Sequence, residues 1–118
     1  MTPQNAGKGT SGPTPSGADL FVTIAHYTTT ADRRQDFLNL LNSRGEILAQ
    51  LGYMPAEPVQ VFADANDPNT LLEIITWSSE AVAAEASGRP EVKRIDNALR
   101  AMIASPGAMS VQHLRRKK

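Results

Sequence analysis

The sequence predicts an α+β domain whose elements follow the order β-α-β-β-α-β, with the second helix broken in two. Three observations give this order. Residues 20–28, 59–64 and 71–77 are rich in β-branched and aromatic side chains, as strands are. Apolar residues recur at helical spacing within 37–51 and within 92–103. Turn-forming residues separate these segments, so each one reads as a single element.

The first strand, residues 20–28, is largely apolar on both faces, so we expect both faces to be covered. One face carries Phe21, Thr23, Ala25 and Tyr27, and the other carries Leu20, Val22, Ile24 and His26. Thr29 and Thr30 then offer hydroxyls that cap a helix. At helical spacing that helix carries Phe37, Leu40, Leu41, Arg44, Ile47, Leu48 and Leu51. Gly52 is expected to end it in the left-handed conformation.

Strands 59–64 and 71–77 form a predicted hairpin, because the Asn-Asp-Pro-Asn sequence at 66–69 favours a turn. A last short strand is expected at 109–114. With helices on one face of the resulting antiparallel sheet, the arrangement is ferredoxin-like.

The second helical region begins where Ser78 or Ser79 supplies an N-cap, and Gly88 ends its first piece. Pro90 suits the first turn of the next helix. The Ser-Pro-Gly sequence at 105–107 ends that helix. This region therefore predicts two consecutive helices.

Residues 1–18 differ from the rest of the chain in composition. They hold four of the eight glycines and three of the eight prolines, and no leucine, isoleucine, valine or aromatic residue. Such a segment buries too little apolar surface to offset its ordering entropy, so we expect a disordered tail. The folded domain is then 19–114, and 115–118 is a basic C-terminal end. A G-x-G-x-x-G sequence at 7–12 lacks the strand and helix that a dinucleotide site needs.

The formal net charge is zero, but the domain 19–114 carries seven basic and twelve acidic residues. This acidic balance argues against nucleic acid as a partner. No apolar run approaches the roughly 20 residues of a membrane span, and no signal peptide is visible. We therefore expect a soluble, cytoplasmic protein without a membrane partner. Cysteine is absent, and the two histidines lack the carboxylate spacing of a metal site, so no metal is expected.

Trp77 and Glu73 are the leading candidates for catalytic residues, because they project from the same face of strand 71–77. A carboxylate among apolar neighbours is unusual, and burial would suit it to proton transfer. His26 is a third candidate, as a titratable side chain on an apolar face. Structural explanations stay open for all three. Glu73 could lie at a sheet edge or pair with an arginine, Trp77 could be core, and His26 could be a packed histidine.

Three aromatic residues are candidates for substrate binding. Tyr27, Tyr53 and Phe62 could line a pocket, although aromatic side chains more often belong to the core. The sequence leaves the two possibilities open.

Several features recur together over 19–114. They are the strand FVTIAHYTTT, Phe37 with the leucines that follow it, the Gly52 stop, the Asp-Pro-Asn turn and the segment TWSSEAVAAEASGRPEV. In this order they resemble the antibiotic biosynthesis monooxygenase family of dimeric α+β barrels. In that family a strand ending in an aromatic residue runs into a short helix, an alanine-rich stretch and a proline. Here Trp77, Ser79, Glu80, Ala81, Ala84 and Pro90 follow that pattern.

The resemblance implies a homodimer whose two sheets pack together. For catalytic members it implies oxidation of an aromatic polyketide-like phenol or anthrone to a quinone by O₂, without flavin, haem or metal. It places Trp77 in the site directly. Glu73 stands where family enzymes more often carry an amide, so it implies either a base or a different substrate.

Other activities on the same scaffold stay open. Haem-degrading relatives carry a histidine in the helix after the tryptophan, whereas this chain has Ala-Glu-Ala-Ser at 84–87, so haem degradation is not expected. A polyketide cyclase or isomerase and a non-catalytic small-molecule-binding dimer are the alternatives, because fold alone does not decide among them.

Overall fold

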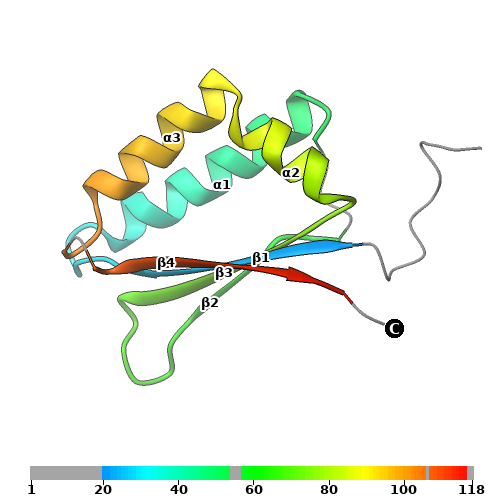
Figure 1. Ribbon diagram of the computed structural model, residues 1–118. Coiled ribbons are helices and arrows are strands. Elements are labelled where there is room, and N and C mark those ends of the chain that lie inside the picture. The colour runs from blue at the N-terminus through cyan, green and yellow to red at the C-terminus, as the bar shows by residue number, and fades with distance from the viewer. Residues whose placement is uncertain (1–19, 54–56, 106, 117–118) are drawn as a thin grey trace, which may run out of the picture.

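The computed structural model describes residues 20–53, 57–105 and 107–116, and its elements follow the predicted order (Figure 1). They are β1 (Phe21–Thr28), α1 (Arg34–Gln50), β2 (Gln60–Ala63), β3 (Thr70–Trp77), α2 (Glu80–Ser87), α3 (Pro90–Ala101) and β4 (Met109–Arg115). The expected tail, 1–18, lies outside the described residues.

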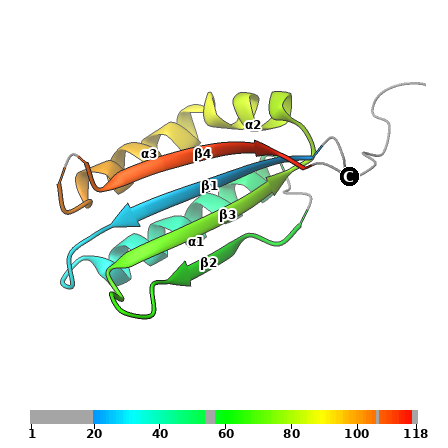
Figure 2. The same ribbon diagram turned by 60° about the horizontal axis from the view of Figure 1, so that its bottom comes forward.

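The four strands form one antiparallel sheet in the order β2-β3-β1-β4. All three helices lie on the same face of this sheet, as Figures 1 and 2 show from two directions. The register places Phe21 opposite Trp77 and Thr23 opposite His113. The α+β, ferredoxin-like prediction is therefore confirmed.

Both faces of β1 were expected to be covered. Among the described residues no helix lies on the opposite face of the sheet, so the single chain covers one of the two faces. Val22 and Ile24 on the uncovered face are only partly buried, and His26 is exposed. We call this side of the sheet the open face.

Helix ends largely follow the residues that predicted them. Ser79 caps α2 by accepting a hydrogen bond from the amide of Val82 at 3.1 Å. Gly52 has a φ of 85°, the left-handed conformation expected after α1. Thr29 does not cap α1, because it lies in an isolated β-bridge opposite Ile103 and the helix begins only at Arg34. Its hydroxyl donates to the carbonyl of Met102 at 2.8 Å. The N-cap residue of α1 is Arg33, which makes no side-chain capping hydrogen bond.

The core between helices and sheet consists of two apolar clusters. One contains Phe21, Leu48, Ile75, Trp77, Ala83, Ala86 and Val92, and the other contains Ala25, Tyr27, Phe37, Leu41, Leu71, Ile95 and Leu99. On β3 and on α1 a charged residue separates the two clusters. Glu73 lies between Leu71 and Ile75, and Arg44 lies between Leu41 and Leu48.

Candidate functional site

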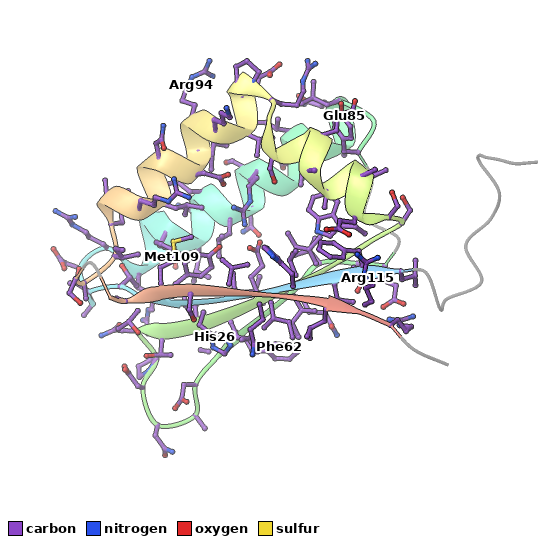
Figure 3. The ribbon with its side chains drawn as sticks, viewed as in Figure 1. His26, Phe62, Glu85, Arg94, Met109 and Arg115 are labelled. Atoms are coloured by element: carbon purple, nitrogen blue, oxygen red, sulfur yellow. The ribbon has the colours of Figure 1, made fainter. Side chains whose placement is uncertain are left out.

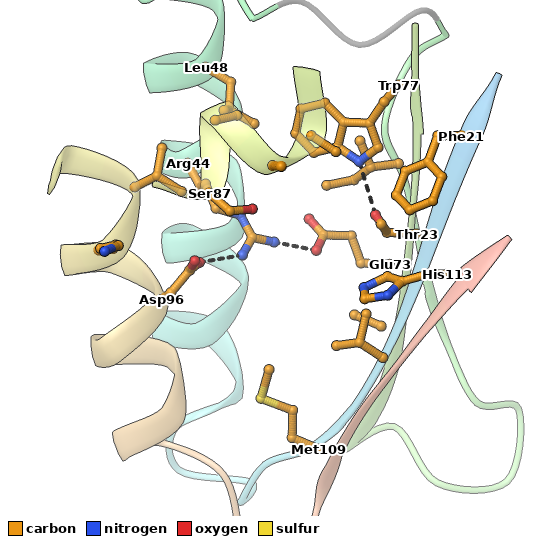
Figure 4. A pocket seen from close by; sticks show the side chains of 18 of the residues that line it. Phe21, Thr23, Arg44, Leu48, Glu73, Trp77, Ser87, Asp96, Met109 and His113 are labelled. Atoms are coloured by element: carbon orange, nitrogen blue, oxygen red, sulfur yellow. Dashed lines mark hydrogen bonds and ion pairs between the residues drawn. The ribbon is translucent and has the colours of Figure 1, made fainter. Parts of the chain in front are cut away.

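A cavity of about 620 Å³ lies between the helices and the covered face of the sheet (Figure 4). Small-molecule sites commonly measure about 300–1,000 Å³, so this volume fits a ligand. Its apolar lining includes Phe21, Leu48, Ile75, Trp77, Ala83, Val92 and Val111. Val111 belongs to the covered face but is 43% exposed, which shows that the cavity opens to solvent beside β4.

A buried charged group occupies the middle of the cavity wall. Glu73 is 3% exposed, and its Oε1 accepts a hydrogen bond from the hydroxyl of Tyr27 at 3.3 Å. Arg44 donates to the same oxygen and forms an ion pair with it. A second nitrogen of Arg44 donates to Oδ1 of Asp96 at 2.7 Å. Arg44 therefore connects a carboxylate of β3 with a carboxylate of α3.

The charges within this group support one another. Burial is the largest single influence on Arg44 and would lower its pKa, but the charge of Glu73, the neighbouring Tyr27 and the hydrogen bonds to Glu73 and Asp96 together outweigh burial and raise it. Burial also raises the pKa of Tyr27, against the opposing effect of the Arg44 charge. Tyr27 is therefore a neutral hydrogen-bond donor over the physiological pH range, and Arg44 is a permanent cation.

Trp77 supplies a second polar feature of the cavity. It ends β3 just before α2, is 5% exposed, and its indole nitrogen donates to Oγ1 of Thr23 at 3.1 Å. A hydroxyl that accepts one hydrogen bond can still donate its own proton. The Trp77–Thr23 pair can therefore present a donor to a bound ligand.

The structure brings three of the six sequence-predicted residues to this cavity. Trp77, Glu73 and Tyr27 line it from adjacent strands of the sheet. The alternation that predicted a shared face for Glu73 and Trp77 is observed. The arginine pairing that the sequence left open for Glu73 is also observed.

The other three predicted residues lie elsewhere. His26 projects from the open face, because it alternates along β1 with the inward residues Ala25 and Tyr27. Phe62 of β2 is 49% exposed on that same face (Figure 3). Tyr53 follows α1, and its hydroxyl donates to Glu85 outside the cavity. His26, Tyr53 and Phe62 therefore do not line this cavity.

Sequence reasoning missed Arg44, Asp96, Thr23 and His113, all of which line the cavity. Two signals could have found the charged pair. Arg44 interrupts the apolar stripe of its helix, and Asp96 directly follows the buried residue Ile95. The two histidines of the chain lie on neighbouring strands, β1 and β4, but His26 and His113 project from opposite faces of the sheet.

Two further tests concern the described part of the chain. It contains no group of three or more histidine, aspartate or glutamate side chains able to hold a metal ion. Within those same residues, no helix is both long and apolar enough to cross a membrane.

Comparisons with known proteins agree with the fold. No protein-family model and no curated protein matches the sequence. Solved structures do match. A conserved protein from Methanosarcina mazei Go1 superimposes with a TM-score of 0.72 at 18% identity, covering 86% of this chain and 96% of that one. An antibiotic biosynthesis monooxygenase gives 0.69 at 16% identity, covering 83% of this chain and 99% of that one.

A third structure carries a more specific description. A variant of SnoaB, a cofactor-independent oxygenase from Streptomyces nogalater, gives a TM-score of 0.72 at 14% identity and covers 86% of this chain and 96% of that one. The described residues thus form a small α+β domain with a ligand-sized cavity between one helical layer and one sheet. The predicted resemblance in fold to antibiotic biosynthesis monooxygenases is confirmed.

Proposed function

We propose that this protein is a cofactor-independent monooxygenase that oxidises an aromatic polyketide-like phenol or anthrone to a quinone with O₂. The observation that carries the proposal is the Trp77–Thr23 hydrogen bond, at 3.1 Å, inside a largely apolar cavity of about 620 Å³. The fold shared with the cofactor-independent oxygenase SnoaB supports it further.

The chemistry asks little of the protein beyond binding and proton transfer. A phenolic anthrone that loses a proton becomes an electron-rich carbanion. This anion passes one electron to O₂, recombines with the superoxide to a peroxide, and loses water to give the quinone. One anthrone and one O₂ thus yield one quinone and one water. The protein has to bind the flat substrate, assist the proton and exclude bulk water.

Named residues fit these tasks. The Trp77–Thr23 pair would donate to the substrate oxygen that becomes negative, and donors fixed at developing charge lower the barrier. Arg44 uses two of the five N–H groups of a guanidinium in its contacts with Glu73 and Asp96. The remaining cationic surface would favour an anionic intermediate. In this scheme Glu73 is a positioning residue that holds Arg44 against the sheet.

The buried charges also favour a second candidate function. A polyketide cyclase or isomerase needs acidic and basic groups beside its substrate but no oxygen. Tyr27, Glu73, Arg44 and Asp96 supply such groups to the same cavity. Dependence on O₂ separates the two enzymes, and binding without turnover identifies a non-catalytic dimer.

The deciding experiment is oxygen uptake by purified, metal-stripped protein supplied with anthrone and no cofactor. Anthrones also autoxidise, so heat-denatured protein and the Trp77→Phe variant are the controls. Uptake above both controls, with quinone forming in equal amount, would support the monooxygenase. Uptake no faster than autoxidation would contradict it for this substrate class.

We propose further that the open face is a homodimer interface. Its apolar side chains are Val22, Ile24, Phe62, Leu72, Ile74 and Leu114. Phe62 is 49% and Leu114 45% exposed in the single chain, and clustered apolar exposure of this kind marks interaction surfaces.

The interface is tested by sedimentation velocity. The wild-type protein is expected to sediment as a dimer and Ile24→Glu as a folded monomer, because a charge in a packed face costs several kcal/mol. Ala49→Glu, at an exposed position of α1, is the matched control and should stay dimeric. A monomeric wild-type protein would contradict this proposal.

A further inference from the structure

Every carboxylate that lines the cavity is already engaged by an arginine. Glu73 and Asp96 both contact Arg44. Glu80 of α2 forms an ion pair with Arg115 of β4. Protonating any of these carboxylates would remove a charge that an arginine faces. Glu73 and its partner Arg44 are largely shielded from solvent, with side-chain exposures of 4% and 11%. These carboxylates are therefore suited to holding charge and poorly suited to accepting a proton from a substrate.

His113 is the remaining side chain of the cavity that can act as a base near neutral pH. It lies on the covered face of β4, directly opposite Thr23 of β1. Its ring centroid is 5.7 Å from that of Phe21, with the planes tilted by 33°. Figure 4 shows the imidazole turned into the cavity, on the side of the sheet from which Thr23 and Glu73 also project. None of the hydrogen bonds or ion pairs of the described residues engages it.

His113 lies close to the Trp77–Thr23 pair. A base and a hydrogen-bond donor, the two groups that help a carbon acid lose its proton, are therefore neighbours in this cavity. Residues opposite one another on neighbouring antiparallel strands lie about 4.5–5.5 Å apart at their Cα atoms. His113 is therefore a strand neighbour of Thr23, which accepts the N–H of Trp77. In an anthrone the acidic methylene lies across the central ring from the carbonyl. A substrate whose oxygen meets the Trp77–Thr23 pair would present that methylene to the imidazole.

The charged and titratable groups that line the cavity together with His113 come from several elements. Glu73 of β3, Arg44 of α1 and Asp96 of α3 form one ion-paired group on the same side of the sheet. The other charged or titratable groups that line the cavity are Tyr27, Lys93, Arg100 and Glu80, and Glu80 is paired with Arg115. His113 is itself exposed on the edge strand, so its proton can pass to solvent.

We infer that His113 is the general base of this cavity, taking a proton from the acidic carbon of an anthrone-like substrate. This inference rests on the proposed function and extends it to the residue that starts the reaction. The neutral imidazole nitrogen accepts the proton, and the electron pair of the broken C–H bond stays on the substrate and spreads to its oxygen. When O₂ has added, the imidazolium returns a proton to the peroxide anion. The histidine thus ends the cycle unchanged.

Proton abstraction can be measured without oxidation. Under nitrogen in D₂O, the acidic methylene of anthrone exchanges hydrogen for deuterium, and proton NMR follows the exchange. Wild-type protein is expected to accelerate exchange, with a rate that rises as a histidine loses its proton between about pH 5 and pH 8. His113→Gln is expected to lower the catalysed rate about 10²–10⁴-fold, the usual contribution of a general base.

Two further variants separate chemistry from structure. His26→Gln removes the other histidine, on the open face, and should keep the rise in rate with pH. His113→Ala should regain part of its exchange rate when free imidazole is added, which a misfolded variant would not do. Equal exchange rates in wild type and His113→Gln would overturn the inference. So would wild-type exchange no faster than that of denatured protein.

Oxygen uptake distinguishes this inference from the proposed function. Catalysed exchange that needs His113, together with no oxygen uptake, would support the base and contradict the monooxygenase. Oxygen uptake that is unchanged in His113→Gln would support the monooxygenase and overturn the base.

Discussion

Arg44 of α1 is buried against the carboxylate of Glu73 on β3, with side-chain exposures of 11% and 4%. The contact joins the helical layer to the sheet at the boundary between the two apolar clusters. A buried ion pair adds little net stability, because desolvation offsets the attraction between the charges. Losing one partner is costly, since the other charge is left buried and alone.

The Arg44→Met variant is therefore expected to lose about 3–5 kcal/mol of unfolding free energy. Methionine keeps much of the packing volume but leaves the carboxylate of Glu73 without its cation. Urea unfolding followed by circular dichroism measures the loss. Arg94→Met, on the exposed outer side of α3 in Figure 3, should change stability by less than about 0.5 kcal/mol.

The double variant Arg44→Met/Glu73→Gln checks the cause. If the loss comes from a stranded charge, neutralising Glu73 should return part of the stability. A double variant less stable than Arg44→Met alone would show instead that packing, and not charge, dominates at this site.

The fold follows from local patterns, which is why the sequence predicts it well. Strand alternation, helical spacing and the Ser79 and Gly52 signals each depend on neighbours a few residues away, and the structure contains all of them. The predicted Thr29 cap is wrong because Thr29 lies in a β-bridge with Ile103, which is distant in sequence, and the helix begins later, at Arg34. Local rules cannot foresee such a tertiary contact.

Only part of the candidate site can be predicted from the sequence, for a related reason. Alternation shows which residues share a face, so Glu73 and Trp77 were grouped correctly, but it does not show which face the helices cover. His26 projects from the open face of β1, and Tyr27 one residue later projects into the cavity. The Arg44–Asp96 bond joins two helices through residues 52 positions apart, so no local pattern could establish it.

Tyr27 gives stability a dependence on high pH. Burial raises its pKa in the folded protein above the value of about 10 in the unfolded chain. Above that unfolded value the unfolded state loses its proton first, so stability that is complete below about pH 10 falls as pH rises toward the folded pKa. Unfolding free energies measured across this range should fall less steeply in Tyr27→Phe than in wild type.

Tyr53 is the control for this alkaline effect. Its hydrogen bond to Glu85 also raises the pKa of its phenol, but the side chain is not buried in the core. Tyr53→Phe should keep most of the alkaline loss. A Tyr27→Phe variant with the wild-type dependence would contradict burial as the cause.

Replacing glycine by alanine is expected to change stability in opposite directions at two positions, one inside α1 and one just after it. An added Cβ at Gly45 or at Gly52 meets no atom within 4 Å, so only the backbone conformation matters. Gly52→Ala should destabilise by about 1–2 kcal/mol, because its φ of 85° is left-handed. Gly45→Ala, inside the helix, should stabilise by about 0.5–1 kcal/mol. Thermal unfolding of both variants tests the pair, and equal signs would refute this backbone argument.

The Trp77–Thr23 hydrogen bond carries the proposed function, so substitution of either partner should lower the activity by a similar factor. Removing the indole N–H in Trp77→Phe, or its acceptor in Thr23→Val, is expected to lower kcat/KM for quinone formation about 10- to 100-fold, corresponding to one lost donor to a developing charge. Thr23→Ser keeps the hydroxyl and should retain most of the activity. Stopped-flow absorbance of the quinone provides the rates.

Ligand binding separates loss of catalysis from loss of the cavity. Trp77 is the only tryptophan, so its fluorescence reports occupancy directly. A hydroxyanthraquinone, which resembles the product, should quench wild-type and Thr23→Val fluorescence with similar affinity, because packing provides most of the binding. If the rate of quinone formation falls in Thr23→Val while its affinity for the hydroxyanthraquinone is unchanged, the hydrogen bond stabilises the transition state. If affinity falls as steeply as the rate, the pair binds substrate and transition state equally, and the oxyanion role is wrong.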